Sequence, residues 1–174
     1  SGTAIYLTAA VGDVLSAPLL PVLLFTIAGS IAFATGSSWS TMSILLPLVV
    51  GLAYELGIDT SIGGVGLVVI SIGAVLEGAI FGDHCSPISD TTVLSSTACA
   101  SDHVDHVRTQ MPYALLAMGV AIVCGYLPVT YLGLSPWLCL PAGALALYAF
   151  LRLFGQRADT LLEDAAQEHD PAQA

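Results

Sequence analysis

The chain has 174 residues, of which 56% are hydrophobic and only 9% are charged, and its net charge is −10. Soluble domains carry about a quarter charged residues, so this composition and a mean hydropathy of +0.87 predict an integral membrane protein. The basic residues are three arginines, too few to form a surface that binds nucleic acid.

The first part of the chain contains two apolar runs that are separated by a short polar stretch. Residues 1–17 hold only a short apolar piece and are expected to form a loop or an interfacial segment. Residues 18–54 are predicted to form a helical hairpin, in which Gly36 suits the end of the first helix and Ser38 the N-cap of the second. The second apolar run, Met42–Tyr54, extends roughly 20 Å as a helix and does not cross a hydrocarbon core of ~30 Å. The hairpin is therefore either re-entrant, with its polar tip at mid-depth, or a pair of spans with a tight polar turn.

Residues 62–100 are predicted to form one transmembrane helix with a break in its middle. The first part, residues 62–81, is apolar and long enough to be a span. After the break, Ser86 and Pro87 suit the N-cap and the first position of a half-helix. Small residues recur at every fourth position before the break and provide a face for close helix packing: Ala74, Gly78 and Gly82.

Two further spans, residues 109–132 and 136–154, follow a polar loop, and an acidic tail, residues 155–174, ends the chain. The tail is poor in apolar residues and is expected to be disordered. Two crossings separate the basic residues, so all of them fall on one side of the membrane: Arg108, Arg152 and Arg157. The positive-inside rule makes that side cytoplasmic, which predicts a multi-pass protein of the cell membrane with a cytoplasmic tail.

The break, Gly82–Thr92, places two carboxylates, a histidine and several hydroxyl groups between apolar runs. Ionisable groups at membrane depth are costly and usually face a partner or a water-filled path. Backbone groups freed by a broken helix are tolerated only where protein or water satisfies them. The sequence therefore predicts that this stretch forms the floor of an ion or substrate site.

Three motifs resemble the NhaC family of sodium/proton antiporters: Phe33–Met42, Phe81–Ser96 and Asp102–Gln110. The second motif is long and unusual, whereas the first departs slightly, because the family usually has Thr and Gly where Ser37 and Ser40 stand. Family members are much longer, so the resemblance implies the C-terminal part of a transporter with one inverted repeat largely missing. It also implies an all-α integral membrane fold like that of the ion-transporter superfamily: a transporter half with a re-entrant hairpin and a broken transmembrane helix.

A Na⁺/H⁺ exchanger needs a group that binds either ion but not both. A carboxyl group does this when burial or a second carboxylate brings its pKa near the working pH. Asp90 is our first candidate for this group and Asp83 the second, and both are candidate Na⁺ ligands. Hydroxyl groups and unwound carbonyls coordinate Na⁺ in other transporters. The predicted ion-binding set is Asp90, Asp83, Glu77, Ser86, Ser89, Thr91, Ser37, Ser38 and Thr41.

Some members of this set also suit ordinary structural roles. Ser86 can act only as a helix cap, and Asp90 can merely complement the helix dipole. Asp83 and Glu77 can form a structural pair of carboxyl groups.

The histidines allow similar alternatives. His84 is a candidate proton relay, whereas His84 and Cys85 alone make a poor zinc site. His103 and His106 lie between acidic residues and indicate a solvated loop, with pH sensing as the sharper alternative.

We expect a secondary active transporter, not an enzyme, that exchanges Na⁺ for H⁺ through buried carboxylates. The alternative is a Na⁺- or H⁺-coupled exchanger of an organic acid or amino acid, whose carboxylate the half-helix N-terminus would hold. The sequence has no arginine at membrane depth to pair with such an anion, which favours the cation. A channel or a non-transporting subunit fits less well, because polarity is confined to two breaks. The expected partners are the lipid bilayer, Na⁺, H⁺, the N-terminal half of the transporter and a second copy in a homodimer, with no cofactor.

Overall fold

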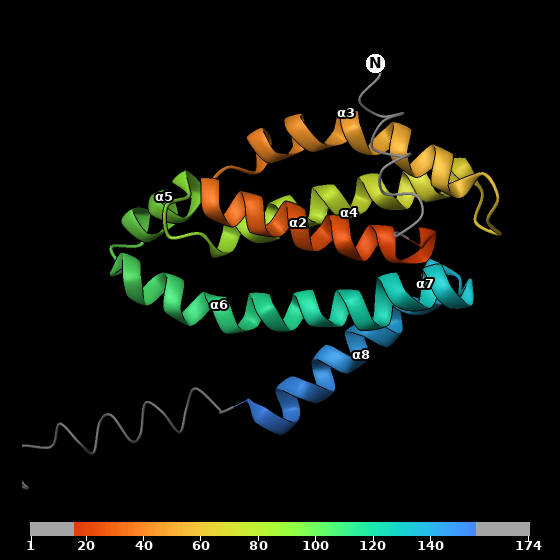
Figure 1. The fold of residues 1–174 in the computed structure, drawn as a ribbon. Helices are drawn as coiled ribbons and strands as arrows, with labels where there is room; N and C mark the ends of the chain where they lie inside the picture. Colours follow the sequence, from red (N-terminus) through yellow and green to blue (C-terminus); the bar gives the residue numbers. More distant parts are fainter. Residues whose placement is uncertain (1–15, 156–174) are drawn as a thin grey trace, which may run out of the picture.

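The computed structural model describes residues 16–155, and this part of the chain is built from helices (Figure 1). In chain order the elements are η1 (Ala17–Leu19), α2 (Leu20–Thr35), α3 (Ser38–Gly57), α4 (Gly64–Cys85), α5 (Asp90–Ala98), α6 (His103–Val120), the π-helical η2 (Ala121–Tyr126), α7 (Leu127–Leu132) and α8 (Pro136–Phe154). The predicted acidic tail and nearly all of the predicted N-terminal segment lie outside the described residues.

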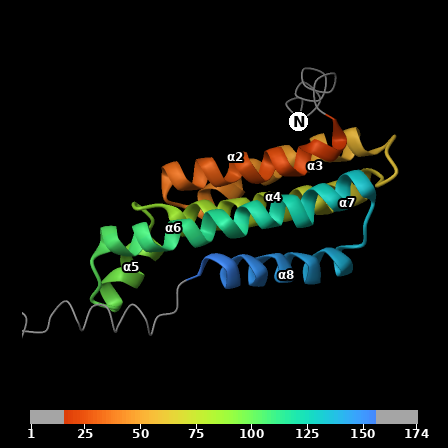
Figure 2. The same ribbon diagram turned by 90° about the horizontal axis from the view of Figure 1, so that it is seen from below.

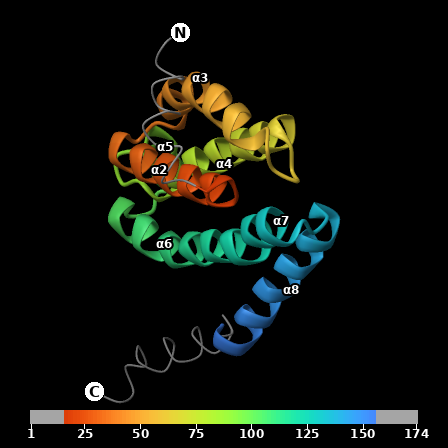
Figure 3. The same ribbon diagram turned by 45° about the vertical axis from the view of Figure 1, so that its right-hand side comes forward.

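Five helical segments are long and apolar enough to cross a membrane: Ala17–Thr35, Ser38–Gly57, Gly64–Cys85, His103–Leu132 and Pro136–Phe154. The chain is thus an all-α, multi-pass membrane protein, as its composition predicts. Helix α4 packs against both α2 and α3, and α6 with η2 and α7 runs along the other side of α2 and α4 (Figures 1 and 2). Helix α8 packs on η2 at its beginning and then diverges from the other helices (Figure 3).

The predicted face of small residues on α4 is confirmed and brings the α2 and α4 backbones together. A Cβ atom at Gly82 would meet the carbonyl oxygen of Gly29 and lie 2.8 Å from the backbone nitrogen of Phe33. A Cβ atom at Gly78 would meet the carbonyl oxygen of Phe25. Ala74, one turn earlier, is fully buried. Only glycine at these contacts lets α4 lie close to α2, because any larger side chain fills the space that the α2 backbone occupies.

The hairpin turns at Gly36, which ends α2 in the left-handed conformation at φ 66°, as predicted. The predicted N-cap is wrong by one residue, because Ser37 and not Ser38 caps α3, accepting a hydrogen bond from the Ser40 backbone nitrogen at 3.4 Å. A Cβ atom at Gly36 would lie 2.8 Å from the Ile88 carbonyl oxygen, so this turn contacts the break that follows α4.

Helix α3 is longer than the apolar run Met42–Tyr54 predicts. It has 20 residues and continues through Pro47. Polar residues enter its first turns because their hydroxyl groups donate to backbone carbonyls one turn earlier: Thr41 Oγ1 to Ser37 at 3.0 Å and Ser43 Oγ to Trp39 at 2.8 Å. At 1.5 Å per residue the helix is about 30 Å long, which is the thickness of a hydrocarbon core.

Two further boundaries differ from the sequence expectations. The first part of the broken helix does not end at Phe81 but continues to Cys85, and α5 begins at Asp90 and not at Pro87. The break is therefore shorter than predicted and comprises residues 86–89. The polar stretch before residue 109 is not a loop but the first turns of α6. Asp102 caps this helix, since its Oδ1 accepts hydrogen bonds from the backbone nitrogens of Val104 and Asp105 at 2.9 and 3.1 Å.

Candidate functional site

The two polar stretches that interrupt the apolar runs meet in space. Ser86, fully buried in the break, donates from its hydroxyl group to the carbonyl oxygen of Phe33 at 2.8 Å. This carbonyl lies in the last turn of α2, so the break packs against the end of the first hairpin helix. Ser38, at the start of α3, reaches the Asp83 carboxylate from the other hairpin helix. The hairpin tip and the break therefore form one site.

Asp83 is the centre of this site. Its side chain is only 6% exposed, and its Oδ1 accepts a hydrogen bond from Ser89 Oγ at 2.8 Å. Its Oδ2 accepts from Thr91 Oγ1 at 3.3 Å and from Ser38 Oγ at 3.4 Å. The carboxylate thus receives hydroxyl groups from the α4–α5 break, from α5 and from α3.

The hydroxyl group of Ser89 is directed at Asp83 instead of capping its own helix. Ser89 occupies the N-cap position of α5, yet its side chain accepts no capping hydrogen bond. Its oxygen lies 2.8 Å from the Asp83 carboxylate and 2.8 Å from Thr91 Oγ1. A hydroxyl group can turn its lone pairs outward when a cation replaces its hydrogen bond, so this set of oxygens can change from donors to ligands.

Asp90 lies at the start of α5, outside the group of hydroxyls around Asp83. Its side chain is exposed, and its Oδ1 accepts a local hydrogen bond from the Thr91 backbone nitrogen at 2.9 Å. In this position the carboxylate complements the positive end of the α5 dipole, which is the structural role considered for Asp90 in the sequence. In the described part of the chain, Asp83 and not Asp90 is the carboxylate that is buried and surrounded by several hydroxyl oxygens.

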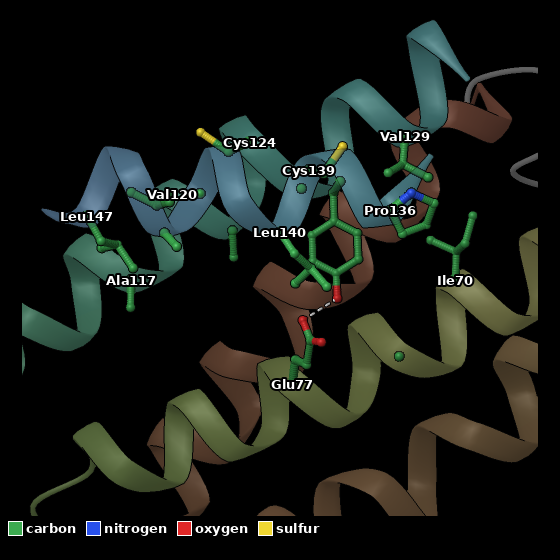
Figure 4. Close-up of a pocket in the computed structure, with 16 residues that line it drawn as sticks. Ile70, Glu77, Ala117, Val120, Cys124, Val129, Pro136, Cys139, Leu140 and Leu147 are labelled. Atoms are coloured by element: carbon green, nitrogen blue, oxygen red, sulfur yellow. Dashed lines mark hydrogen bonds between the residues drawn. The ribbon is translucent and has the colours of Figure 1, made fainter. Parts of the chain in front are cut away.

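Glu77 points to a different neighbour. Its Oε2 accepts a hydrogen bond of 2.6 Å from the hydroxyl group of Tyr126 in the π-helical segment η2 (Figure 4). Six residues along an α-helix correspond to a rotation of about 120° around its axis, so Glu77 and Asp83 leave α4 in different directions. The structural pair of carboxyl groups, considered above as an alternative for these two residues, is not formed.

A groove of about 570 Å³ opens beside Glu77 between α4, the α6–η2–α7 segment and α8 (Figure 4). Its walls are mostly apolar, and Cys124 and Cys139 are among them. Glu77 and His84 also line a neighbouring groove against α6. His84 is exposed, and its Nδ1 is 3.1 Å from the Ile80 carbonyl. Because His84 and Glu77 line the same groove, they lie on the same side of α4.

Ser37, Ser86 and Thr41 support the backbone around the site. Ser37 caps α3, Ser86 ties the break to α2, and the fully buried Thr41 donates to the Ser37 carbonyl. Their hydroxyl groups are engaged with backbone atoms, whereas those of Ser38, Ser89 and Thr91 are directed at the carboxylate.

Sequence reasoning missed two neighbours of the site. Thr92, 4% exposed, lies 3.5 Å from the Asp83 carbonyl and 3.4 Å from the His84 carbonyl, and so satisfies the end of α4. His103 lies 2.7 Å from the Pro87 carbonyl in the break. The motif contains Thr92, but nothing local identifies His103, because it is 16 positions away from its partner.

Comparison with known proteins identifies the family. The sequence profile of the Na⁺/H⁺ antiporter family matches residues 1–129, which include the hairpin, the break and most of the α6–α7 segment. The chain belongs to the Na⁺/H⁺ antiporter family. It is 42% identical over 132 residues to an uncharacterized protein of Haemophilus influenzae, covering 75% of this chain and 24% of that protein.

The chain is also similar to relatives whose names state an activity. The arginine/ornithine antiporter ArcD of Halobacterium salinarum is 37% identical over 57% of this chain and 18% of its own length. The Na⁺/H⁺ antiporter NhaC of Alkalihalophilus pseudofirmus is 39% identical over 42% of this chain and 14% of its own length. The chain thus spans a quarter or less of the curated relatives that it matches. No solved structure matches it.

Proposed function

We propose that this chain forms the ion-binding part of a secondary antiporter that exchanges Na⁺ for H⁺, with Asp83 as the carboxylate that carries the two ions in turn. The observation that carries the proposal is the hydroxyl-lined environment of Asp83. The group is 6% exposed and accepts three hydrogen bonds from Ser38, Ser89 and Thr91. Membership of the Na⁺/H⁺ antiporter family supports the choice of ions.

The chemistry follows from the cost of a charge at membrane depth. An ionised carboxylate that is held away from water needs a counter-charge, and hydroxyl donors alone supply only partial charges. In the described part of the chain the hydrogen bonds to the Asp83 carboxylate come from hydroxyl groups, and the two arginines there belong to α6 and α8. Either Na⁺ or a proton can neutralise the group, but one excludes the other, and this competition is the basis of exchange.

We further propose the re-entrant arrangement for the hairpin α2–α3 and a transmembrane path for α4 and α5 together. Figure 2 shows α5 and the beginning of α6 projecting past the turn between α2 and α3. The break after Cys85 lies at that turn, because Gly36 contacts Ile88. The hairpin tip would then stop part-way along the path of the longer segment His103–Leu132, which has 30 residues, at the depth where a transported ion is expected.

We place Asp83 ahead of Asp90 as the shared carboxylate, because Asp83 is buried among ligand oxygens and Asp90 is exposed. The ion-binding role of Glu77 and the proton-relay role of His84 stay predictions. The proposal places Asp90 outside the ion site, because its side chain is exposed. The lipid bilayer, the N-terminal half and a homodimer are the proposed partners.

The test uses the full-length protein in inside-out membrane vesicles, with a pH-sensitive dye that reports proton movement when Na⁺ is added. Asp83→Asn keeps the shape of the side chain and removes the charge, so it should abolish Na⁺-driven proton movement. Asp90→Asn is the matched control on the same motif and should keep at least half of the wild-type rate. Loss of exchange in Asp90→Asn with full activity in Asp83→Asn, at equal amounts of inserted protein, would return the role to Asp90.

A second candidate function is the coupled exchange of an amino acid or organic acid. The similarity to the arginine/ornithine antiporter of Halobacterium salinarum favours it. The positive N-terminal end of α5 would hold the substrate carboxylate. Vesicles loaded with ornithine that take up labelled arginine without any response to Na⁺ would support this function over Na⁺/H⁺ exchange.

A further inference from the structure

His103 joins the start of α6 to the break and to α5. Its Nε2 lies 2.7 Å from the carbonyl oxygen of Pro87, and its Nδ1 lies 3.0 Å from Ser96 Oγ. Ser96 is 2% exposed and lies in the last turn of α5. The capping hydrogen bonds that the Asp102 carboxylate accepts from two backbone nitrogens of α6 fix the helical turn that carries His103. One imidazole ring therefore contacts both the break, at Pro87, and α5, at Ser96, and so bridges the corner that these two segments form.

The contact with Pro87 requires a proton on Nε2, because a carbonyl oxygen only accepts. Nδ1 has two options. In the neutral ring it accepts from the Ser96 hydroxyl group, and in the charged ring it donates to that oxygen while Ser96 donates to the Val93 carbonyl at 3.0 Å. Nε2 donates to the Pro87 carbonyl in both states, so this contact does not depend on the charge of His103.

The Pro87 carbonyl lies at a sensitive place in the chain. It follows Ser86, which ties the break to α2, and precedes Ser89, whose hydroxyl group contacts Asp83. The break lacks the regular backbone hydrogen bonds of a helix, so its carbonyl groups need donors from elsewhere. A shift of Pro87 would move Ser89, and hence the oxygen nearest to the carboxylate.

We propose that His103 is a positioning residue of the ion site: through Nε2 it holds the Pro87 carbonyl, and thereby keeps Ser89 and Thr91 at Asp83. The effect on ions rests on the proposed function, but the effect on the backbone does not. His106 provides a matched control, since it lies one turn further along α6 and none of the hydrogen bonds found in residues 16–155 involves its side chain.

The first experiment measures the break directly, in the full-length protein with every other cysteine replaced. Cys85 is 3% exposed and directly precedes the break, so the rate at which a small maleimide labels it reports opening of this corner. His103→Ala should raise the labelling rate about tenfold, as expected when a protected group loses one or two hydrogen bonds that hold it closed. His106→Ala should leave the rate unchanged.

Two amide variants separate the two ring nitrogens. The amide nitrogen of glutamine reaches about as far as Nε2 and can donate to Pro87, whereas that of asparagine reaches only about as far as Nδ1. His103→Gln should therefore label like the wild type, and His103→Asn like His103→Ala. Equal labelling of all four variants and the wild type would overturn the proposal, and so would fast labelling of His103→Gln and His106→Ala alike.

The second experiment measures Na⁺-driven proton movement in the same variants. His103→Ala and His103→Asn should raise the Na⁺ concentration for half-maximal exchange about tenfold, while His103→Gln and His106→Ala should not. A wild-type protein that does not exchange Na⁺ would refute the proposed function and leave the labelling result to decide on the role of His103. Raised labelling with an unchanged Na⁺ requirement would overturn the link between His103 and the ion site.

Discussion

Replacing Ser89 by alanine removes the shortest hydrogen bond that Asp83 receives, 2.8 Å from Ser89 Oγ to Oδ1. In the proposed mechanism this change acts twice against Na⁺, because it removes one oxygen ligand and one donor that stabilises the ionised carboxylate. A hydrogen bond to a charged group contributes about 1.5–3 kcal/mol. Ser89 is fully buried, so water does not readily take its place. The expected result is a 10- to 100-fold rise, to order of magnitude, in the Na⁺ concentration for half-maximal exchange.

The distances predict an order among the three hydroxyl groups. Thr91 Oγ1 and Ser38 Oγ lie 3.3 and 3.4 Å from Oδ2, at the weak end of hydrogen bonding, so Thr91→Ala and Ser38→Ala should have smaller effects, about tenfold or less. Ser95→Ala is the control, because Ser95 is exposed on the same helix and donates to the Thr91 carbonyl, not to the carboxylate.

The assay is Na⁺-driven proton movement in inside-out vesicles, at several Na⁺ concentrations and with equal amounts of inserted protein. The maximal rate should change little in all four variants, since each retains the carboxylate. The reasoning is refuted if Ser89→Ala needs no more Na⁺ than Ser95→Ala, or if Ser38→Ala is the most impaired of the set.

Three further predictions concern packing and topology. Gly82→Ala should lower the thermal stability of the full-length protein in detergent, by about 1–3 kcal/mol of overpacking against the α2 backbone, as seen in a thermal unfolding curve. Tyr126→Phe removes the donor to Glu77 and should destabilise the protein by about 1 kcal/mol in the same measurement. A protease site inserted beyond Gln156 should be cut in inside-out vesicles and protected in intact cells, because the positive-inside rule places that end in the cytoplasm.

Each of these predictions has a control on the same structure. Gly73→Ala adds the same methyl group to α4 at a position where no atom beyond the adjacent residues and the helix's own backbone lies within 4 Å, so a similar loss of stability there would contradict the packing argument. Tyr113→Phe removes a hydroxyl group from a tyrosine of α6 that makes no hydrogen bond within residues 16–155 and should be neutral. A protease site in the turn at Gly133, on the other side of the membrane, should show the opposite protection.

The contact between the hairpin tip and the break was predictable, because both are polar interruptions in apolar runs. Polar groups of two interruptions at similar depth can hydrogen-bond to each other, whereas lipid offers neither of them a partner. The close packing of α4 against another helix was likewise predictable, because small residues at every fourth position, Ala74, Gly78 and Gly82, form a face that lets a neighbouring backbone approach.

The choice between Asp83 and Asp90 was not predictable from local pattern. It depends on where α4 ends: with the end at Phe81, Asp83 belongs to a free loop, whereas the observed end at Cys85 holds Asp83 on the last turn of the helix. The helix continues because Thr92 of α5 and Ser86 of the break satisfy its last carbonyl groups, with the Ser86 backbone nitrogen 3.2 Å from the Asp83 carbonyl. These are contacts across the break, and residue spacing within one helix does not encode them.

The distribution of the carboxyl groups has a consequence for how the ions are coupled. Asp83 has several hydroxyl neighbours that suit Na⁺, whereas Glu77 has one phenol, at 2.6 Å, beside an apolar groove. A cation as strongly hydrated as Na⁺ needs more oxygens than the described residues bring to Glu77, so Asp83 is the better Na⁺ site of the two. In the proposed mechanism, competition between Na⁺ and H⁺ is then confined to Asp83. Residues that shape its surroundings, such as Ser89 and His103, should set the Na⁺ requirement, whereas substitutions around Glu77 should not.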